Sequence, residues 1–325
     1  MNTLKEIAEV LFASEKVNIF PHSHMDGDAI GSSTGLYLAL KKLGKEVYIA
    51  CEDSLADNLK FVGADYLTDY EKLEPAGTSV AIDCGDTSRF EKRKELFEKG
   101  NIKVCIDHHE TSKPVFDYNH IDGDASAASE LAAVVVKELE VLSGKQLFDE
   151  EIMTAFFTGI VTDTGCFMYS STTKRCHDIA GEFIAAGLDG SAISTKLWEN
   201  ERLSKVVLNA KAVSNMQLFA DGKAAITVVT REDIASVNGD ENDTDGIVEQ
   251  LRNVSGVEIA CFVKEIAEGK CKVSYRAKSY ANVAQICQKY GGGGHSRAAG
   301  CTLVMPVARA KETVMKDVLE YFSAN

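Results

Sequence analysis

The stretch Ile102-Lys103-Val104-Cys105-Ile106-Asp107-His108-His109 decides the fold and locates the site. Its first five residues are mostly apolar and include three β-branched side chains, a composition typical of a buried strand. The run ends in one carboxylate and two imidazoles, which are groups that bind metal ions. A purely structural strand end has little use for three such groups. We therefore interpret the segment as a buried strand that presents a site at its carboxyl end.

Two further apolar runs, residues 17–20 and 80–82, end in the same kinds of side chain. The side chains that follow them are His22, Asp26, Asp28 and Asp83. In an open α/β sheet, ligands bind in the crevice beyond the carboxyl ends of the strands. A single motif of this kind also occurs by chance, but three strands that end alike are expected to deliver acids and imidazoles to one place.

Helical patterns alternate with these strands in the first half of the chain. A helix from about Gly31 to Gly44 is followed by a strand over 45–50, and this spacing predicts parallel strands joined by a right-handed crossover. The alternation ends in the second half, where a hairpin over 257–276 favours an α+β arrangement. We predict an α/β protein. Its parts are a parallel-sheet domain with helices on both faces (1–188), a helical connector (189–219) and a smaller α+β domain (220–325).

The charge of the chain restricts its partners. The 325 residues carry a net charge of −14. Affinity for long DNA or RNA comes largely from Lys and Arg side chains that neutralise phosphates, so we expect no long nucleic acid as a partner. A small anion at a local site remains compatible with the charge, because metal ions and a few cations reverse the local field.

The cysteines and apolar runs indicate the compartment. Nine cysteines are scattered without a Cys-x-x-Cys pair, and several, such as Cys105 and Cys261, lie in apolar strands. They are typical of buried thiols in a reducing cytoplasm and not of disulfides or a zinc site. No apolar run approaches the ~20 residues needed to span a bilayer, and the first residues lack a signal-peptide core. We expect a cytoplasmic protein with no membrane partner.

The spacing His-x-x-x-Asp-x-Asp at 22–28 places an imidazole and two carboxylates on one loop. Taken alone, each acid is explained equally well as a turn residue. Together with Asp83, His108 and Asp163, these six residues offer seven donors if one carboxylate bridges, enough for two divalent ions roughly 3.5–4 Å apart. Mostly carboxylate ligands with one imidazole per ion favour manganese over thiolate-bound zinc, with magnesium or cobalt as alternatives.

These motifs resemble the four motifs of the DHH phosphoesterase superfamily. The matching residues are His22-x-x-x-Asp26-x-Asp28, Asp83, Asp107-His108-His109 and Asp163. The run 291–295, with the small residues 298–300, is similar to the glycine-rich signature of the DHH-associated C-terminal domain. The resemblance spans nearly the whole chain and is strongest to the nanoRNase and pAp-phosphatase group. That group degrades very short oligonucleotides and removes the 3′-phosphate of adenosine 3′,5′-bisphosphate (pAp).

The resemblance implies roles for the site residues. The two sets of metal ligands would be His22, Asp26 and Asp83, and Asp28, Asp83, His108 and Asp163, with Asp83 bridging. Asp107 would orient the imidazoles from behind, as such acids commonly do. His109 would face the substrate phosphate. His24 is an additional imidazole inside the first motif, and we predict that it binds neither ion.

The four glycines at 291–294 have two explanations. By composition they form a flexible linker, but the histidine and small residues that follow fit backbone amides approaching a phosphate closely. The residues predicted to clamp the distal phosphate or terminal nucleotide are Arg276, Gly293, Gly294 and His295. The family commonly has Ser after this arginine, where the chain has Ala277. Arg89 is as well explained by a contact with phosphate as by a surface position.

The resemblance implies a two-metal phosphoesterase that cleaves very short oligonucleotides, such as the dinucleotide pApA, to mononucleotides, and pAp to AMP and phosphate. The catalytic residues would be Asp83, Asp107, His108 and His109. The alternatives are an inorganic pyrophosphatase or polyphosphatase of the same superfamily, and a non-catalytic nucleotide-binding module. A homodimer is the expected assembly, because two-fold oligomers are the commonest.

Overall fold

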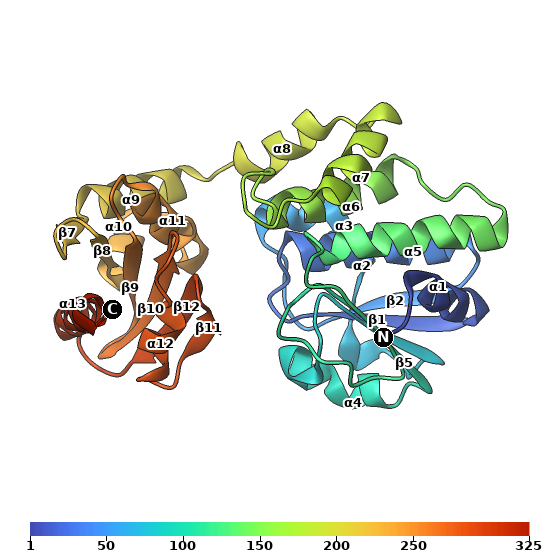
Figure 1. The fold of residues 1–325 in the computed structure, drawn as a ribbon, viewed down its shortest axis with the longest axis horizontal. Helices are drawn as coiled ribbons and strands as arrows, with labels where there is room; N and C mark the ends of the chain where they lie inside the picture. Colours follow the sequence, from blue (N-terminus) through green and yellow to red (C-terminus); the bar gives the residue numbers. More distant parts are fainter. Residues whose placement is uncertain (325) are drawn as a thin grey trace. The chain divides into compact units, whose positions relative to one another are not determined.

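The structure is a computed structural model that describes residues 1–324, apart from the side chain of His295. Contacts divide the chain into two compact units, Met1–Asn200 and Glu201–Asn325 (Figure 1). The stretch 189–219, expected to be a helical connector, is shared between them. Helix α8 (Gly190–Trp198) lies in the first unit, and helix α9 (Leu203–Ser214) and strand β7 (Gln217–Phe219) lie in the second.

The first unit is built on a six-stranded sheet in which every pair of neighbouring strands is parallel, as predicted. The strands are β1 (Lys16–Pro21), β2 (Glu46–Cys51), β3 (Leu67–Asp69), β4 (Thr78–Ile82), β5 (Ile102–Asp107) and β6 (Tyr118–Ile121). Their order is β3-β2-β1-β4-β5-β6. The direction of winding therefore reverses between β1 and β4, and a crevice for ligands is expected beyond the carboxyl ends of these two strands.

Helices cover both faces of this sheet, because residues along β1 alternate between two cores. Val17 and Ile19 belong to the larger core, and Phe20 packs with Phe90 and Phe97 on the opposite face. The helices of the larger core are α1 (Leu4–Ala13), α2 (Gly27–Lys42), α3 (Lys60–Gly63), α5 (Ala128–Ser143), α6 (Glu150–Asp163), α7 (Lys174–Ala185) and α8. The opposite face carries η4 (Thr87–Arg93) and α4 (Lys94–Glu98), and the remaining turns are η1 (Asp57–Leu59), η2 (Ala64–Tyr66) and η3 (Tyr70–Lys72).

Helix α2 begins earlier than predicted, at Gly27 and not near Gly31. Asp26 is its N-cap, and Oδ1 of Asp26 accepts hydrogen bonds from the amides of Asp28 (3.1 Å) and Ala29 (3.0 Å). A side chain at Gly27 would collide with Thr162 of α6, so the glycine marks a close approach of two helices and not a break before the helix. As a consequence, Asp28 lies in the first turn of a buried helix.

The second unit is the predicted α+β arrangement around a mixed sheet, of order β11-β12-β10-β9-β8-β7. The β8–β9 pair is parallel and the other pairs, including the predicted β9–β10 hairpin, are antiparallel. The strands are β8 (Ala224–Val229), β9 (Ile259–Ala267), β10 (Lys270–Ala277), β11 (Gly293–His295) and β12 (Ala298–Leu303). Its other elements are α10 (Arg231–Ser236), η5 (Glu241–Thr244), α11 (Ile247–Asn253), α12 (Val283–Gln288) and α13 (Val307–Ala324).

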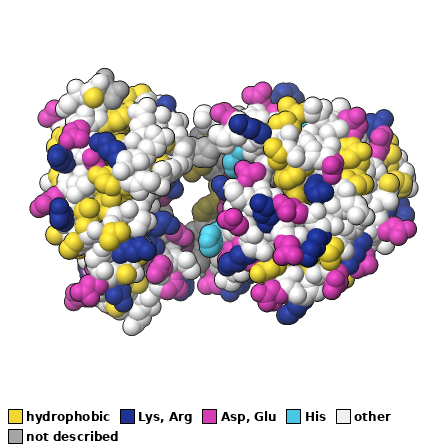
Figure 2. Space-filling view, turned by 90° about the horizontal axis from the view of Figure 1, so that it is seen from below, with side chains coloured by type: hydrophobic (Ala, Val, Ile, Leu, Met, Phe, Trp, Pro, Cys, Tyr) yellow, Lys and Arg dark blue, Asp and Glu magenta, His cyan; other side chains and the backbone are white. Residues whose placement is uncertain are grey.

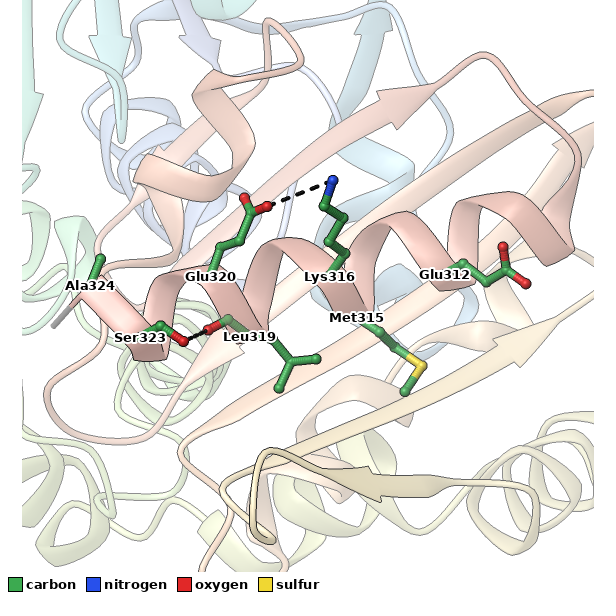
Figure 3. Close-up of a pocket in the computed structure, with 7 residues that line it drawn as sticks. All are labelled: Glu312, Met315, Lys316, Leu319, Glu320, Ser323 and Ala324. Carbon is green, nitrogen blue, oxygen red and sulfur yellow. Dashed lines mark hydrogen bonds and ion pairs between the residues drawn. The ribbon is translucent and has the colours of Figure 1, made fainter.

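Helix α13 is amphipathic. Ala310, Val314 and Val318 are fully buried in the core that this helix shares with the sheet. Its outward side lines a pocket whose residues include Met315 and the Lys316–Glu320 ion pair of 3.8 Å, and in Figure 3 Met315 points to the opposite side of the helix from this pair. This division of apolar and charged side chains is that of a surface helix.

Glu258, just before β9, holds the loop that connects β10 to α12. Its carboxylate is 5% exposed and accepts hydrogen bonds from the amides of Ser279 (3.0 Å), Tyr280 (2.7 Å) and Ala281 (2.8 Å), and from the Ser279 hydroxyl (2.7 Å). Burial alone would raise the pKa of Glu258, but the hydrogen bonds from Ala281 and Ser279 outweigh it and lower the pKa below its ordinary value. Three consecutive amides therefore depend on one ionised carboxylate.

We expect Glu258→Gln to lower the free energy of unfolding of the second unit by about 1.5–3 kcal/mol, because an amide offers one acceptor oxygen and no charge. The depressed pKa makes the contribution of Glu258 complete above the pKa of the unfolded chain, about 4.5, and lost as the pH falls through the folded pKa. Denaturant unfolding of both proteins at pH 7 and at lower pH measures the effect. The difference should shrink on acidification, and the exposed Glu268→Gln is the control. A difference independent of pH would contradict this assignment.

The remaining expectations concern cysteines and the membrane. All nine cysteines are free thiols, and seven of them are buried. Among residues 1–324, none of the helices combines the length and the apolar character that crossing a membrane would require.

Candidate metal centre

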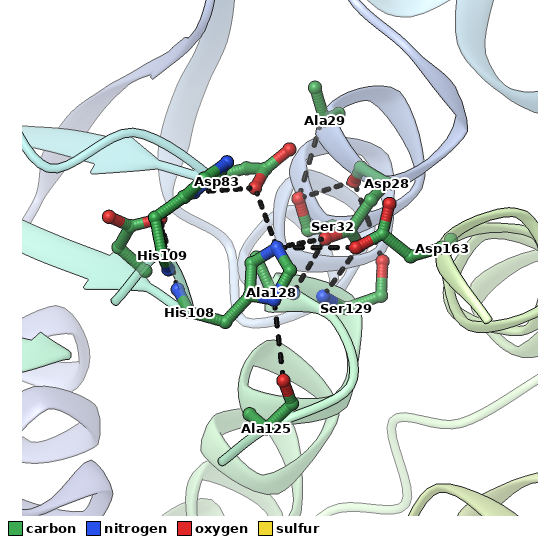
Figure 4. A network of polar contacts seen from close by, with 12 residues as sticks. Asp28, Ala29, Ser32, Asp83, His108, His109, Ala125, Ala128, Ser129 and Asp163 are labelled. Atoms are coloured by element: carbon green, nitrogen blue, oxygen red, sulfur yellow. Dashed lines mark hydrogen bonds and ion pairs between the residues drawn. The ribbon is translucent and has the colours of Figure 1, made fainter. Parts of the chain in front are cut away.

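The carboxyl ends of β1, β4 and β5 and the end of α6 bring acids and imidazoles together, as the strand ends predicted. Figure 4 shows the part of this centre around His108, with Asp28, Asp83 and Asp163. The contributing residues are His22 and Asp26 after β1, Asp28 in α2, Asp83 after β4, Asp107, His108 and His109 at the end of β5, and Asp163 at the end of α6. Three groups among the described residues have ligand atoms within 4.8 Å of one another. They are His22–Asp26–Asp83, Asp28–His108–Asp163 and Asp83–His108–His109.

The first group is centred on His22. Its Nε2 lies 3.5 Å from Oδ2 of Asp26 and 3.4 Å from Oδ2 of Asp83. Its Nδ1 lies 2.8 Å from the carbonyl oxygen of Ser23. A carbonyl only accepts, so Nδ1 carries the proton and Nε2 is left to bind a cation between the two carboxylates.

The second group is centred on His108. Its Nε2 lies 3.3 Å from Oδ2 of Asp163, 3.4 Å from Oδ1 of Asp83 and 3.7 Å from Oδ2 of Asp28. Its Nδ1 lies 3.3 Å from the carbonyl oxygen of Ala125, which again leaves Nε2 for a cation. Asp83 thus points one oxygen to each imidazole group, the arrangement of a bridging carboxylate.

Asp83 is under unusual constraints. It is 2% exposed, and its backbone is left-handed (φ +57°), a conformation that a residue with a side chain rarely adopts. Among the described residues, its Oδ1 accepts no hydrogen bond. A buried carboxylate oxygen that accepts no hydrogen bond is costly. The chemistry of the donor set therefore fits a cation at this position.

Asp28 is held by the start of helix α5, a contact that sequence reasoning missed. It is fully buried, and its two oxygens accept hydrogen bonds from the amides of Ala128 (2.6 Å) and Ser129 (2.8 Å). The first amides of a helix have no partner within the helix and attract negative charge. The available signal is the run of small residues 125–129 after the acidic turn 122–124, a pattern that is typical of a helix start but does not indicate its partner.

Asp107 lies behind the two imidazoles. It is fully buried, and its Oδ1 lies 2.8 Å from Nδ1 of His109 and accepts the His108 amide at 2.9 Å. Its Oδ2 accepts a hydrogen bond from the Ser112 hydroxyl. Both oxygens are therefore used within the protein, as suits an acid that orients imidazoles. His109 Nδ1 also lies 3.7 Å from Oδ1 of Asp83, which places this ring beside the centre.

The electrostatics of the centre call for positive charge. Burial and then the charge of Asp83 raise the pKa of Asp28 to about 7, and burial and then Asp28 raise the pKa of Asp163 to about 9. Burial lowers the pKa of His22 and His108, but the adjoining carboxylates outweigh it and raise both to about 10. Without cations, protons on Asp28, Asp163 and the two imidazoles offset the negative charge, and two divalent ions can replace these protons.

A buried arginine supports the loop of His22 and was not predicted. Arg93 is 1% exposed; its Nη1 donates to the carbonyl of Ala50 (2.7 Å), and its Nη2 lies 3.3 Å from Oγ of Ser23 and 3.7 Å from Oε1 of Glu52. No feature of the sequence indicates its burial, because Arg93 stands in an ordinary charged run, 91–95. The predicted Arg89 is exposed, and its carbonyl accepts the Ser23 amide at 2.7 Å.

His24 lies outside the three groups of candidate ligands. Its side chain is 88% exposed, and its Nδ1 lies 3.6 Å from Oδ2 of Asp53.

The predicted clamp residues come together in the second unit. Strand pairing aligns residue 276 of β10 with Ala298 of β12, and Ala298 with residue 295 of β11, so three adjacent strands bring these positions into one row. Arg276 is 30% exposed, and its Nε donates to Glu249 at 2.9 Å. Gly294 has φ +136°, a conformation that favours glycine. The side chain of His295 lies outside the described part of the structure, so the clamp stays a prediction.

Two family descriptions match the chain. Residues 16–160 match the DHH family, N-terminal domain, and residues 221–324 match the DHHA1 domain. The chain is 35% identical, over 98% of its length and 94% of the relative's, to the Thermus thermophilus protein named bifunctional oligoribonuclease and PAP phosphatase NrnA. A Bacillus subtilis protein of the same name is 26% identical over 92% of each chain.

Solved structures agree in fold. An exopolyphosphatase-related protein from Bacteroides fragilis superposes with a TM-score of 0.90 over 98% of this chain and 96% of its own, at 23% identity. RecJ from Thermus thermophilus, in complex with Mn²⁺, gives a TM-score of 0.60 over 99% of this chain and 55% of its own, at 15% identity. At these identities the likeness concerns the fold alone.

Proposed function

The chain belongs to the DHH family of phosphoesterases, and from that premise we propose that it hydrolyses very short oligoribonucleotides to mononucleotides and pAp to AMP and phosphate. One observation carries the proposal: the identity to the Thermus thermophilus oligoribonuclease and PAP phosphatase extends over 98% of this chain, and so over both units. The convergence of acids and imidazoles in the first unit supports it.

Enzymes of this family are metal-dependent. The proposed ligands are His22, Asp26 and Asp83 for one divalent ion and Asp28, Asp83, His108 and Asp163 for the other, with manganese as the metal. When bound, such ions lower the pKa of water and stabilise charge on phosphoryl oxygens. In this scheme Asp107 fixes the ring of His109 through Nδ1, and His109 presents Nε2 to the substrate phosphate.

The preference for short substrates has independent support in the charge of the protein. The net charge is −14, and acidic and basic side chains are interspersed over the face seen in Figure 2. Long nucleic acids need many neutralised phosphates. A few local contacts suffice for a dinucleotide, and we propose that Arg276, Gly293, Gly294 and His295 supply them at the far end of the substrate. A cytoplasmic homodimer is part of the proposal.

The test is hydrolysis of four substrates by the purified protein, with manganese and after chelation. The substrates are pApA, a longer RNA, pAp and pyrophosphate. We expect chelator-sensitive release of mononucleotides from pApA and of phosphate from pAp, with little cleavage of the long RNA. Cleavage of pyrophosphate alone would favour the pyrophosphatase alternative. Bound metal without any cleavage would favour a non-catalytic nucleotide-binding module.

A further inference from the structure

The chain reverses sharply just beyond Asp163, the last residue of α6. Gly165 (φ +54°), Cys166 (φ +56°) and Phe167 (φ +63°) are three consecutive left-handed residues. Two of them carry side chains, and this conformation costs such residues energy, so the surrounding structure must enforce it. The amide of Cys166 bonds to the carbonyl of Val161 (2.8 Å), and further bonds from residues 168 and 169 to the Thr164 carbonyl close the turn. The turn thereby fixes the next two side chains, Met168 and Tyr169, directly after the helix that ends in Asp163.

The ring of Tyr169 lies flat against Gly165. A Cβ built on Gly165 would be nearest to Cζ of the ring and almost equally distant from Cε1 (2.6 Å) and Cε2 (2.7 Å). A point at near-equal distances from these atoms lies over the face of the ring, not at its edge. One face of Tyr169 is therefore covered by bare backbone, while the residue as a whole is 47% exposed.

The neighbouring residues make this ring part of a small apolar surface. Phe167 stacks on His177 of α7, with ring centroids 4.8 Å apart and planes 20° apart, which anchors the turn. Met168 is 79% exposed. Met168 and Tyr169 are two consecutive exposed side chains that follow Asp163, a proposed metal-binding residue, by only a few positions. Such a surface suits a molecule that joins a flat apolar group to a phosphate. A nucleotide is such a ligand.

We infer that Tyr169 is the platform on which the nucleobase next to the scissile phosphate stacks, with Met168 as a flanking apolar contact. The inference deepens the proposed function and rests on it for the identity of the substrate. A base stacked on an aromatic side chain contributes about 1–3 kcal/mol, and every base has a π-face. Tyr169 therefore supplies affinity for any base without selecting among them.

The test compares substrates with and without the base. The variants are Tyr169→Ala, Tyr169→Phe and Tyr169→Trp. The substrates are pApA and two dinucleotides in which one or the other base is replaced by hydrogen. Loss of about 1–3 kcal/mol predicts a fall of roughly 5–150-fold in kcat/KM for pApA with Tyr169→Ala. Phe and Trp should retain activity. For the substrate that lacks the stacked base, wild type and Tyr169→Ala should be equal.

Two controls separate stacking from folding. Phe12 is an exposed aromatic of α1, which precedes β1 and so lies at the amino-terminal edge of the sheet, opposite the centre; Phe12→Ala should change nothing. Metal content should be the same in all variants. An equal loss on all three substrates would assign Tyr169 a structural role and overturn the inference. So would full activity of Tyr169→Ala on pApA.

A binding readout distinguishes failure of this inference from failure of the proposed function. Stacking quenches the fluorescence of 2-aminopurine, so a dinucleotide that carries it should be quenched by wild type and Tyr169→Phe but not by Tyr169→Ala. If quenching depends on Tyr169 but no hydrolysis occurs, the proposed function is wrong and the stacking role of Tyr169 is supported. If hydrolysis occurs but quenching does not depend on Tyr169, the proposed function is supported and the stacking role of Tyr169 is wrong.

Discussion

Asp83→Asn is expected to lower kcat on pApA by at least about 10³-fold. Asp83 directs one oxygen to His22 and the other to His108, so both proposed ions depend on it. Asparagine has nearly the same volume but offers one neutral oxygen and an NH₂ group that cannot bind a cation. Metal ions stabilise the transition state by several kcal/mol. A loss of about 4 kcal/mol corresponds to 10³-fold. Steady-state kinetics at saturating manganese, together with metal content, measure the effect.

Asp117 is a matched control, because it lies at the amino-terminal ends of the strands, opposite the metal centre. Asp117 precedes β6, accepts the amide of Lys103 at 2.8 Å and is 51% exposed. Asp117→Asn should keep both ions and full activity. If Asp83→Asn retained two ions and more than a tenth of the wild-type kcat, Asp83 would not be the shared ligand.

Asp26→Asn and Asp163→Asn are expected to lose one ion each. Asp26 belongs only to the group of His22, and Asp163 only to that of His108. Asparagine at 26 can still accept hydrogen bonds as the N-cap of α2, so the fold should persist. We expect the metal content to fall from two ions per chain to one, and kcat to fall by about 10²–10³-fold, comparable to the loss of one electrostatic stabiliser.

The two variants should differ in which ion remains. Their metal contents after dialysis, and the magnetic coupling of paired manganese ions in electron paramagnetic resonance spectra, test the division. Coupling should disappear in both variants while one ion stays bound. If either substitution removed both ions, or neither, the division into two groups would be wrong.

The parallel sheet could be predicted because its signals are local. The run 102–109 carries both the apolar strand and its terminal acids, and strands ending alike in a parallel sheet meet at one edge. The start of α2 was predicted wrongly because the site residues 22–28 were all interpreted as one loop, whereas the helix begins at Gly27. Only its close approach to Thr162, more than a hundred residues away, explains a glycine there.

The supports of the centre could not be predicted, because each depends on a distant partner. The amides of Ala128 and Ser129 reach Asp28 from about a hundred residues away along the chain. Arg93 is buried although most residues of its kind are exposed. The sequence around Tyr169 does not indicate that its ring lies on Gly165, because that contact depends on three consecutive left-handed residues.

The hydrogen bonds from α5 to Asp28 affect how the centre binds metal ions. Asp28 belongs to the first turn of α2 and is bound by the first turn of α5, so the same carboxylate fastens two helices of the main core. It cannot swing away from a cation without breaking its hydrogen bonds to the α5 amides. This side of the proposed coordination sphere is therefore ordered before any metal ion binds. The conformational entropy of fixing Asp28 is lost when the chain folds and not when the ion binds.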